Sequence, residues 1–431
     1  MTMLSFLSLG LLALPAVHAT GSPFHARDAS TDSANSTNST VDMVAAAWYT
    51  GWHSDTLTLG NVSWDKYTHL VYSFAATEPS ANVSLDGSDP ELLPQFVSMA
   101  HDNAVKAMVS VGGWGGSTHF SDNMATPDNI TNFVQSIASF ATQYDLDGID
   151  FDWEYPGKQG IGCNVVSEND TDNFLSFLQA FRQEMGSKFI MTASVPVVPW
   201  TGSNGSSVSN VSDFATVLDW VNVMNYDVHG SWDSTVGPNA PLNDTCANST
   251  TAVGSAVSAL AAWSAAGMPA HQIVLGVAGY GHSYAVEPSA AVAQNGTLNM
   301  YPAFNTSEQP LGDAWDNATN TDVCGVVSGP SGVMDFWGLI EGGYLNPNGS
   351  VADGIIYIFD GCSQTPFVYD ECSQVMVSFD DADSFGAKGS FIADSNLRGF
   401  AMWEAGSDYN DILLDSIRAA AGFPDDEDDD C

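Results

Sequence analysis

The stretch that decides the fold is Asp147-Gly-Ile-Asp-Phe-Asp-Trp-Glu-Tyr-Pro156. Its three carboxylates, at Asp150, Asp152 and Glu154, alternate with large apolar residues, a period of two that is typical of a β-strand with every acid on one face. Neighbouring acids on such a strand have Cα atoms about 6.6 Å apart, since each residue adds roughly 3.3 Å. In a dry site they cannot all be ionised without large pKa shifts. The row therefore indicates chemistry rather than a solvated strand face.

Seven further apolar runs accompany this stretch, and amphipathic segments lie between most of them. The eight runs are residues 44–48, 69–75, 107–111, 148–153, 189–195, 220–224, 273–277 and 399–403. The amphipathic segments, which predict helices, are residues 90–103, 127–144, 170–185, 214–218, 253–266, 381–393 and 411–421. Strands that alternate with helices form parallel sheets, and eight such repeats predict an α/β fold of the (β/α)8 TIM-barrel class.

The alternation of predicted strands and helices is interrupted after the seventh apolar run. Residues 283–378 are rich in Gly, Asn and aromatic residues, and a structureless loop of that length would be unusual, so we predict a small α+β insertion domain there. The barrel would then comprise residues 43–282 and 379–422. Residues 1–19 are typical of a signal peptide, 20–42 of a flexible Ser/Thr/Asn-rich linker, and 423–431 form an acidic tail.

Composition limits the partners of the chain. Lys and Arg number 9 against 51 acids, a formal net charge of -42, which disfavours nucleic acids and anionic membranes as ligands. The apolar leader and fourteen Asn-x-Ser/Thr sequons indicate a secreted, extracellular glycoprotein. In such a protein the six cysteines favour disulfides over a zinc site. One arrangement pairs Cys163 with Cys246 and joins two of Cys324, Cys362 and Cys372, although spacing alone does not settle connectivity.

Active sites of barrels lie at the C-terminal ends of the strands, where this chain has a concentration of aromatic and acidic residues. At or just past the strand ends are Tyr49, Phe74, Gly113, Trp114, Glu154, Met224, Tyr226, Asp227, Tyr280 and Trp403. A single aromatic residue at such a position is often part of the core. Their gathering at one end of the barrel predicts a site.

Several of these segments are similar to motifs of family 18 glycoside hydrolases, the chitinases. Residues 147–156 resemble the signature of that family, and Ser110-Val-Gly-Gly-Trp114 resembles its third-strand motif. The motifs of its sixth, seventh and eighth strands are matched, in order, by Met224-Asn-Tyr-Asp227, Leu275-Gly-Val-Ala-Gly-Tyr-Gly281 and Ala401-Met-Trp-Glu404. The likeness covers roughly residues 44–422.

The resemblance implies a secreted enzyme that hydrolyses chitin with retention, in which the N-acetyl group of the substrate acts as the nucleophile. Glu154 would be the general acid and base, Asp152 its mobile partner and Asp150 a deeper charge coupled to Asp152. Tyr226 would donate to the acetamido oxygen. Substrate would contact Trp403, Trp114, Tyr49, Phe74, Met224, Asp227, Gly113 and Tyr280.

The resemblance also implies chitin or N-acetylglucosamine oligomers as the ligand, no metal or other cofactor, and a monomer. One position departs from the family, because His282 stands where many members have Arg after the seventh-strand Tyr-Gly. Two alternatives use the same architecture: an endo-β-N-acetylglucosaminidase that trims N-glycans, and a chitin-binding lectin. The lectins typically lack the acid at the end of the fourth strand, and the N-glycan enzymes usually lack the Trp-Glu-Tyr-Pro continuation.

Overall fold

The computed structural model describes residues 42–245 and 253–424. The expected signal peptide, the linker up to residue 41, Cys246 and the acidic tail from residue 425 lie outside the described residues. Within the described ranges, no helix is long and apolar enough to cross a membrane.

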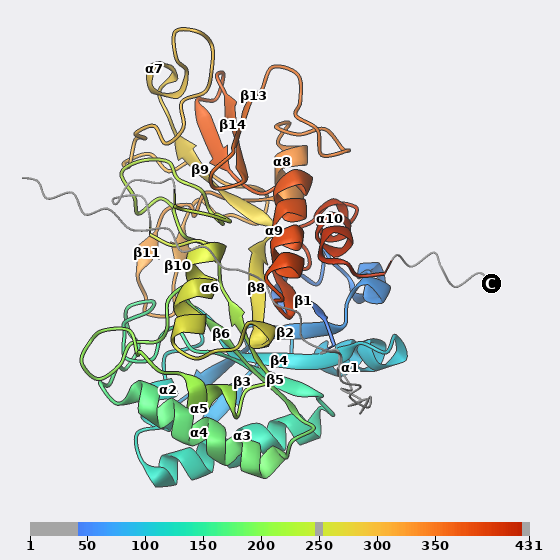
Figure 1. Ribbon diagram of the computed structural model, residues 1–431, viewed down its shortest axis with the longest axis vertical. Helices are drawn as coiled ribbons and strands as arrows, with labels where there is room; N and C mark the ends of the chain where they lie inside the picture. The colour runs from blue at the N-terminus through green and yellow to red at the C-terminus, as the bar shows by residue number, and fades with distance from the viewer. Residues whose placement is uncertain (1–41, 246–252, 425–431) are drawn as a thin grey trace, which may run out of the picture. The chain divides into compact units, whose positions relative to one another are not determined.

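Eight parallel strands close into a ring, which confirms the predicted barrel (Figure 1). The strands are β1 (Val44–Thr50), β2 (His69–Glu78), β4 (Lys106–Gly112), β5 (Gly148–Asp152), β6 (Ile190–Val195), β7 (Trp220–Val223), β8 (Ile273–Ala278) and β16 (Gly399–Trp403). Each strand pairs with the next in that order, and β1 pairs with both β2 and β16, which closes the ring. The short β3 (Asn82–Ser84) adds to β2 in antiparallel orientation.

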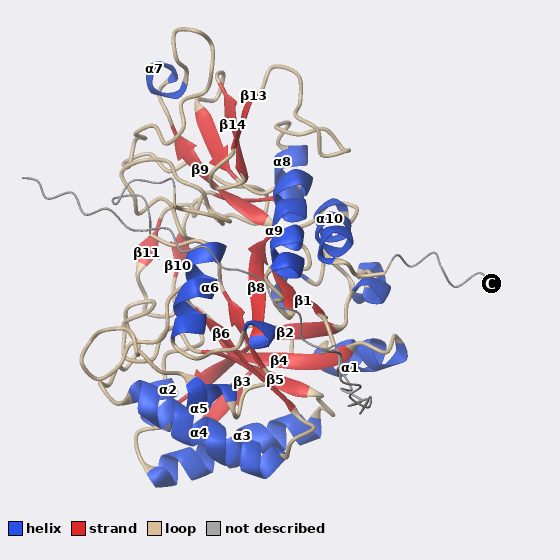
Figure 2. Cartoon of the chain, viewed as in Figure 1, coloured by secondary structure: helices blue, strands red, loops and turns tan. Residues whose placement is uncertain are grey.

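The helix α3 (Pro127–Gln143) shows how the amphipathic segments become the outer layer of the barrel. The hydroxyl of Thr126 accepts a hydrogen bond from the backbone N–H of Asn129 and caps the helix, and Pro127 occupies the first turn. One face of α3 is buried, with Phe133 and Ile137 at its centre. The other helices are α1 (Leu93–Asp102), α2 (Phe120–Asn123), α4 (Asp170–Met185), α5 (Ser212–Ala215), α6 (Ala256–Ala265), α9 (Ala382–Asp394) and α10 (Ile412–Ala421), shown in Figure 2.

Strand β5 has the alternation expected from its sequence. All five of its residues are buried, so neither face is solvated. The ring of Phe151 packs against Phe177 and Phe181 of α4, with centroids 5.3 and 5.5 Å apart, so its face points towards the helices. Asp150 and Asp152 therefore point into the barrel, and burying two acids there is tolerated only because other groups hydrogen-bond them or they hold a proton.

The insertion forms an antiparallel sheet with the order β12-β9-β15-β14-β13, as expected for an α+β insertion. Its strands are β9 (Tyr280–Ala285), β12 (Val333–Asp335), β13 (Ile356–Asp360), β14 (Thr365–Asp370) and β15 (Val375–Ser378). The segment also holds the helices α7 (Pro288–Ala291) and α8 (Phe336–Glu341), and a separate hairpin of β10 (Asn320–Thr321) and β11 (Val327–Ser328). The sheet starts at Tyr280, a single residue after β8, earlier than the expected start of the insertion at residue 283.

The disulfide arrangement differs from the expected one. Cys163 is bonded to Cys324, so the pairing of Cys163 with Cys246 is wrong. Cys362 is disulfide-bonded as well, and Cys372 is an exposed free thiol, so the expected bond between two of Cys324, Cys362 and Cys372 is also wrong. Spacing along the chain misled here because the insertion that carries Cys324 folds back over the barrel mouth, towards the loop that carries Cys163.

Candidate active site

Asp150 is fully buried and surrounded by donors from three neighbouring strands. Its Oδ1 accepts hydrogen bonds from the Thr192 hydroxyl at 2.6 Å and the Asn222 amide at 3.1 Å, and its Oδ2 from the hydroxyls of Ser110 and Ser194, both at 2.9 Å. Burial raises the pKa of this carboxyl, and the hydroxyl donors oppose that shift. Asp150 does not line the cleft described below, so its position is that of a fixed charge behind the site.

Asp152 lies one step closer to solvent and lacks comparable support. Its Oδ1 is buried and has no hydrogen-bond partner among the described residues. Burial first, and then the charges of Glu154 and Asp150, raise the pKa of Asp152 well above its usual value, which favours a protonated carboxyl. A neutral, unpartnered carboxyl that lines a cleft can give or accept a hydrogen bond when a ligand enters.

Glu154 lies two residues beyond the end of β5 and also lines the cleft. Burial raises its pKa from 4.5 to about 7; a hydrogen bond with Tyr155 opposes the rise and the charge of Asp227 adds to it. The backbone of Glu154 is held on both sides: its N–H donates to the Ser117 hydroxyl at 3.0 Å, and its carbonyl accepts from the Asn164 amide at 3.1 Å. A rigidly held carboxyl with a pKa near neutrality is suited to both giving and taking a proton.

Tyr226 and Asp227, which follow β7, face these acids across the cleft. Burial, and then the charges of Asp152 and Asp227, raise the pKa of Tyr226 well above its usual value, so its hydroxyl keeps its proton and can donate. Asp227 has a positive φ of 54°, and its Oδ1 lies 2.8 Å from His282 Nε2 on β9. The residue that replaces the family's Arg therefore contacts Asp227, and Tyr280 lines the cleft beside it.

The cleft is a groove of about 1330 Å³ between the strand ends and the insertion. Its floor is aromatic: the rings of Phe74 and Trp403 stack 5.3 Å apart at 15°, and Trp52 stacks on Phe74 at 5.9 Å. Trp114 stands on one wall with 51% of its surface exposed. Flat rings of this kind pack against the apolar faces of sugars. Met224 completes the set of predicted residues that line the cleft.

Two predicted contact residues lie elsewhere. Tyr49 is 1% exposed, packs on Tyr72 and Phe96, and donates its hydroxyl to the Leu57 carbonyl at 2.7 Å, so it belongs to the core. Phe96 belongs to α1, so the side chain of Tyr49 points from β1 towards the helix layer and away from the cleft.

Gly113 does not line the cleft either. It has a φ of +80°, and a Cβ at this position would come within 2.7 Å of the Phe74 ring. Its N–H donates to the Asp152 carbonyl at 2.8 Å. Glycine is therefore needed for backbone conformation and for packing of the aromatic floor, rather than for contact with a ligand.

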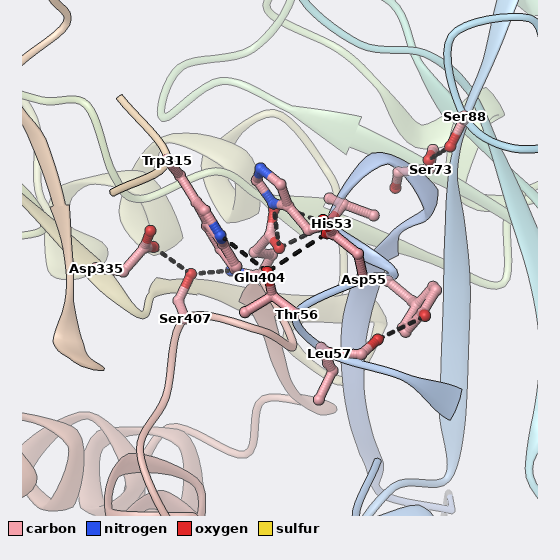
Figure 3. A network of polar contacts seen from close by, with 12 residues as sticks. His53, Asp55, Thr56, Leu57, Ser73, Ser88, Trp315, Asp335, Glu404 and Ser407 are labelled. Atoms are coloured by element: carbon pink, nitrogen blue, oxygen red, sulfur yellow. Dashed lines mark hydrogen bonds and ion pairs between the residues drawn. The ribbon is translucent and has the colours of Figure 1, made fainter. Parts of the chain in front are cut away.

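A second group of carboxylates in the cleft was missed by the sequence analysis (Figure 3). Glu404 and Asp335 are each 5% exposed and line the cleft. Oε1 of Glu404 accepts a hydrogen bond from the Thr50 hydroxyl at 2.6 Å and lies 3.1 Å from His53 Nδ1. The Ser407 hydroxyl donates to Asp335 at 2.5 Å, and burial, followed by the charges of Asp313 and Glu404, raises the Asp335 pKa well above its usual value.

This second group extends the polar lining of the cleft beyond the β5 acids. The ring of His53 stacks on Trp315 of the insertion with centroids 3.6 Å apart, which joins the barrel to the insertion at this point. Glu404 could have been suspected, because it ends the quoted Ala401-Met-Trp-Glu404 motif. Asp335 and Trp315 had no recognisable signal, since they lie in the irregular segment. Among the described residues, no group of three or more His, Cys, Asp or Glu side chains is arranged to hold a metal ion.

Comparison with known proteins agrees with this geometry. The sequence model of glycosyl hydrolases family 18 matches residues 44–408. A Moniliophthora roreri protein named chitinase-like effector is 47% identical over 382 residues, 88% of this chain and 93% of that protein. Chitinase A1 of Niallia circulans is 30% identical over 73% of this chain and 42% of its own length. The crystal structure of a Rhizomucor miehei chitinase matches with a TM-score of 0.78 and 32% identity, over 88% of this chain and all of that one. The chain therefore belongs to family 18 of the glycosyl hydrolases.

Proposed function

We propose that the protein is a secreted, monomeric chitinase that hydrolyses β-1,4-linked N-acetylglucosamine polymers with retention of configuration. The observation that carries this proposal is the pair Asp152 and Glu154, two buried carboxyls with raised pKa values at the floor of an aromatic cleft. Raised carboxyl pKa values in a cleft are a property of catalytic acids, whereas a protein that only binds sugar has no need of them.

The first step needs an acid and a nucleophile. Glu154 donates its proton to the glycosidic oxygen, and the bond between that oxygen and the anomeric carbon breaks. Asp150 and Asp152 lie on β5 and Glu154 lies just beyond its end, so this row of acids offers no separate carboxylate on the opposite side of the sugar ring. The carbonyl oxygen of the substrate's own acetamido group attacks the anomeric carbon instead, giving an oxazolinium ion while the leaving chain departs with the proton.

Asp152 and Tyr226 position the acetamido group for this attack. The unpartnered Oδ1 of Asp152 takes a hydrogen bond from the acetamido N–H, and the negative charge shared by Asp150 and Asp152 stabilises the positive charge that develops on the ring. The protonated hydroxyl of Tyr226 donates to the acetamido oxygen. These two contacts hold the nucleophile close to the anomeric carbon and so reduce the entropic part of the barrier.

The second step reverses the proton transfer. Water enters from the side that the leaving chain vacated, and the Glu154 carboxylate removes a proton from it. The hydroxyl adds to the anomeric carbon, the oxazolinium opens to restore the acetamido group, and Glu154 is again protonated. Two inversions at one carbon give overall retention.

The two alternatives make different use of the cleft. A chitin-binding lectin would need the aromatic floor but not the proton donor at Glu154. An endo-β-N-acetylglucosaminidase would share the chemistry but take a branched N-glycan. Several aromatic residues line the groove, Trp114, Trp403 and Trp315 among them, which suits a linear polymer that presents repeated apolar faces.

The substrate's acetamido group provides the test of this mechanism. We expect hydrolysis of fully N-acetylated chitin oligomers with the β-anomer released first, and no hydrolysis of fully deacetylated oligomers of equal length, because these carry no internal nucleophile. Rapid analysis of product anomers by chromatography or NMR measures both. Comparable turnover on deacetylated oligomers would exclude the substrate-assisted mechanism, and turnover only on N-glycans would favour the endo-β-N-acetylglucosaminidase.

The pKa of Glu154 predicts a pH dependence. The general acid must be protonated in the free enzyme, and its protonated fraction falls tenfold per unit above a pKa of about 7. We therefore expect log kcat/KM to fall with a slope of about -1 above pH 7. Asp227→Asn removes a charge that raises this pKa, so the alkaline limb should move to lower pH. An alkaline limb that begins at the same pH in Asp227→Asn, or that begins near pH 4.5 in the unmodified protein, would contradict Glu154 as the titrating acid.

A further inference from the structure

The β10–β11 hairpin is a short, well-defined projection from the insertion. Asn320 and Thr321 of β10 pair with Ser328 and Val327 of β11. The turn between them is organised by Asp322, whose Oδ1 accepts hydrogen bonds from the N–H groups of Cys324 at 2.9 Å and Val326 at 2.8 Å. An acidic side chain that satisfies two turn amides fixes the direction of the tip and so presents Cys324 in a defined position.

The order of the strands shows where this tip reaches. The insertion leaves the barrel after β8, and β8 is separated from β4 by β7, β6 and β5 on one side and by β16, β1 and β2 on the other. β4 thus lies directly opposite β8 in the ring, and β5 lies next to β4. Cys324 is bonded to Cys163, which belongs to the loop between β5 and α4. The disulfide therefore connects two sides of the barrel mouth.

Contacts beside the disulfide agree with this crossing. A methyl group placed on Gly115, in the loop after β4, would lie 3.5 Å from Cγ1 of Val323 at the hairpin tip. The Asn164 side chain, next to Cys163, donates to the carbonyls of Glu154 and Ser117 at 3.1 and 3.4 Å, so the tethered loop is anchored to the catalytic strand end. The tip is thereby attached to the wall that carries the general acid.

Residues on both sides of this connection line the cleft. The paired base of the hairpin, Asn320 and Ser328, lines the cleft on the side of the insertion. Trp114, Tyr155 and Lys158 line it on the side of the β4 and β5 loops. The hairpin thus lines the wall on the side of the insertion, and its tip is covalently joined to the loop after β5, which carries Tyr155 and Lys158 of the other wall.

We propose that the Cys163–Cys324 bond covers the cleft and makes it a passage that a polysaccharide enters only by threading from a chain end. This rests on the proposed function, since it takes the occupant to be a β-1,4-linked N-acetylglucosamine chain. A strand of polymer cannot pass sideways through a covalent loop, whereas an open groove admits it at any point. The two cysteines therefore determine which parts of a polymer are available for cleavage: ends, and not the middle.

Threading has a kinetic consequence. A chain that has entered leaves only by sliding out lengthwise, so its dissociation is slow and one binding event permits successive cleavages. A covered passage therefore lowers the dissociation rate more than the same contacts between protein and sugar would in an open groove.

The experiment uses the full-length protein carrying Glu154→Gln, so that ligands are bound and not cleaved. Two N-acetylglucosamine octamers serve as probes, one with a bulky dendritic group on a single end and one with such groups on both ends. We expect the disulfide-bonded protein to bind the doubly blocked octamer at least about tenfold more weakly than the singly blocked one in calorimetry. Cys163→Ser/Cys324→Ser in the same background should bind both octamers equally.

A matched control is Cys362→Ser, which removes another disulfide-bonded cysteine and leaves the Cys163–Cys324 bridge intact, so it should still reject the doubly blocked octamer. Equal binding of both octamers by the disulfide-bonded protein would overturn the proposal, even if the double variant does not fold. Failure to bind a third probe, the octamer without blocking groups, would instead contradict the proposed function, and the two results are distinguishable.

Discussion

Glu154→Gln is expected to reduce kcat on chitin oligomers by about 10²- to 10⁴-fold, the usual contribution of a positioned general acid. Gln has almost the same shape but carries no transferable proton, so neither protonation of the leaving oxygen nor activation of water can occur. The backbone contacts that hold residue 154, to Ser117 and Asn164, do not involve the side chain and remain. The loss should therefore appear in kcat, with oligomer affinity largely retained.

Steady-state hydrolysis and calorimetric binding of the same oligomer measure the two quantities separately. Glu91→Gln is a matched control, because Glu91 is exposed on the surface before α1 and outside the cleft, and this variant should be indistinguishable from the unmodified protein. Turnover of Glu154→Gln within a few-fold of normal would show that the proton comes from another group. Lost binding would show that the change disturbs the cleft.

Asp152→Asn is expected to reduce kcat by about 10²- to 10³-fold, comparable to removing one preorganised electrostatic contact to a transition state. The carboxyl of Asp152 accepts the acetamido N–H and shares with Asp150 the charge that stabilises the oxazolinium ion. Asn cannot exchange a proton with Asp150, so no negative charge can move to position 152 as the sugar ring becomes positive. Because the positive charge develops only in the transition state, kcat should fall more than KM changes.

The measurement is the separate determination of kcat and KM on acetylated oligomers, with a thermal unfolding curve for each variant. A structural role alone would lower the melting temperature and leave the ratio of the two constants unchanged in the folded fraction. Unaltered kcat in a stable Asp152→Asn protein would exclude the residue from the chemistry. Asp150→Asn offers a contrast, because it disturbs four hydrogen bonds in the core and should reduce stability as well as rate.

Local pattern was sufficient for most of the barrel. Runs of four to eight apolar residues formed strands at each expected place, and the alternation at residues 148–152 correctly predicted which side chains of β5 point inward. These features depend on periodicity, which acts over a few residues and can be read from the chain. Among the predicted helices, residues 214–218 matched poorly: the helix found there, α5, spans Ser212–Ala215.

Positions at the strand ends were predicted less well. Tyr49 lies near the end of β1 and Trp52 just past it, yet Tyr49 is in the core and Trp52 is 42% exposed in the cleft. Tyr49 lies on the face of β1 that packs against α1, whereas Trp52 lies past the end of the strand, and strand ends are the least certain part of a prediction from sequence. Gly113 was expected to meet substrate for the same reason and instead makes room for Phe74.

The sequence by itself determined the acid row, the order of its residues and the alternation of strands and helices that predicts the barrel, because each is a periodic pattern among residues near one another in the chain. Only the tertiary structure decided which acids reach the cleft, that Glu404 and Asp335 join them, and that Cys163 is bonded to Cys324. Those features depend on segments more than a hundred residues apart meeting across the barrel mouth. No local periodicity encodes such a meeting, since it follows from how the ring closes and where the insertion folds back.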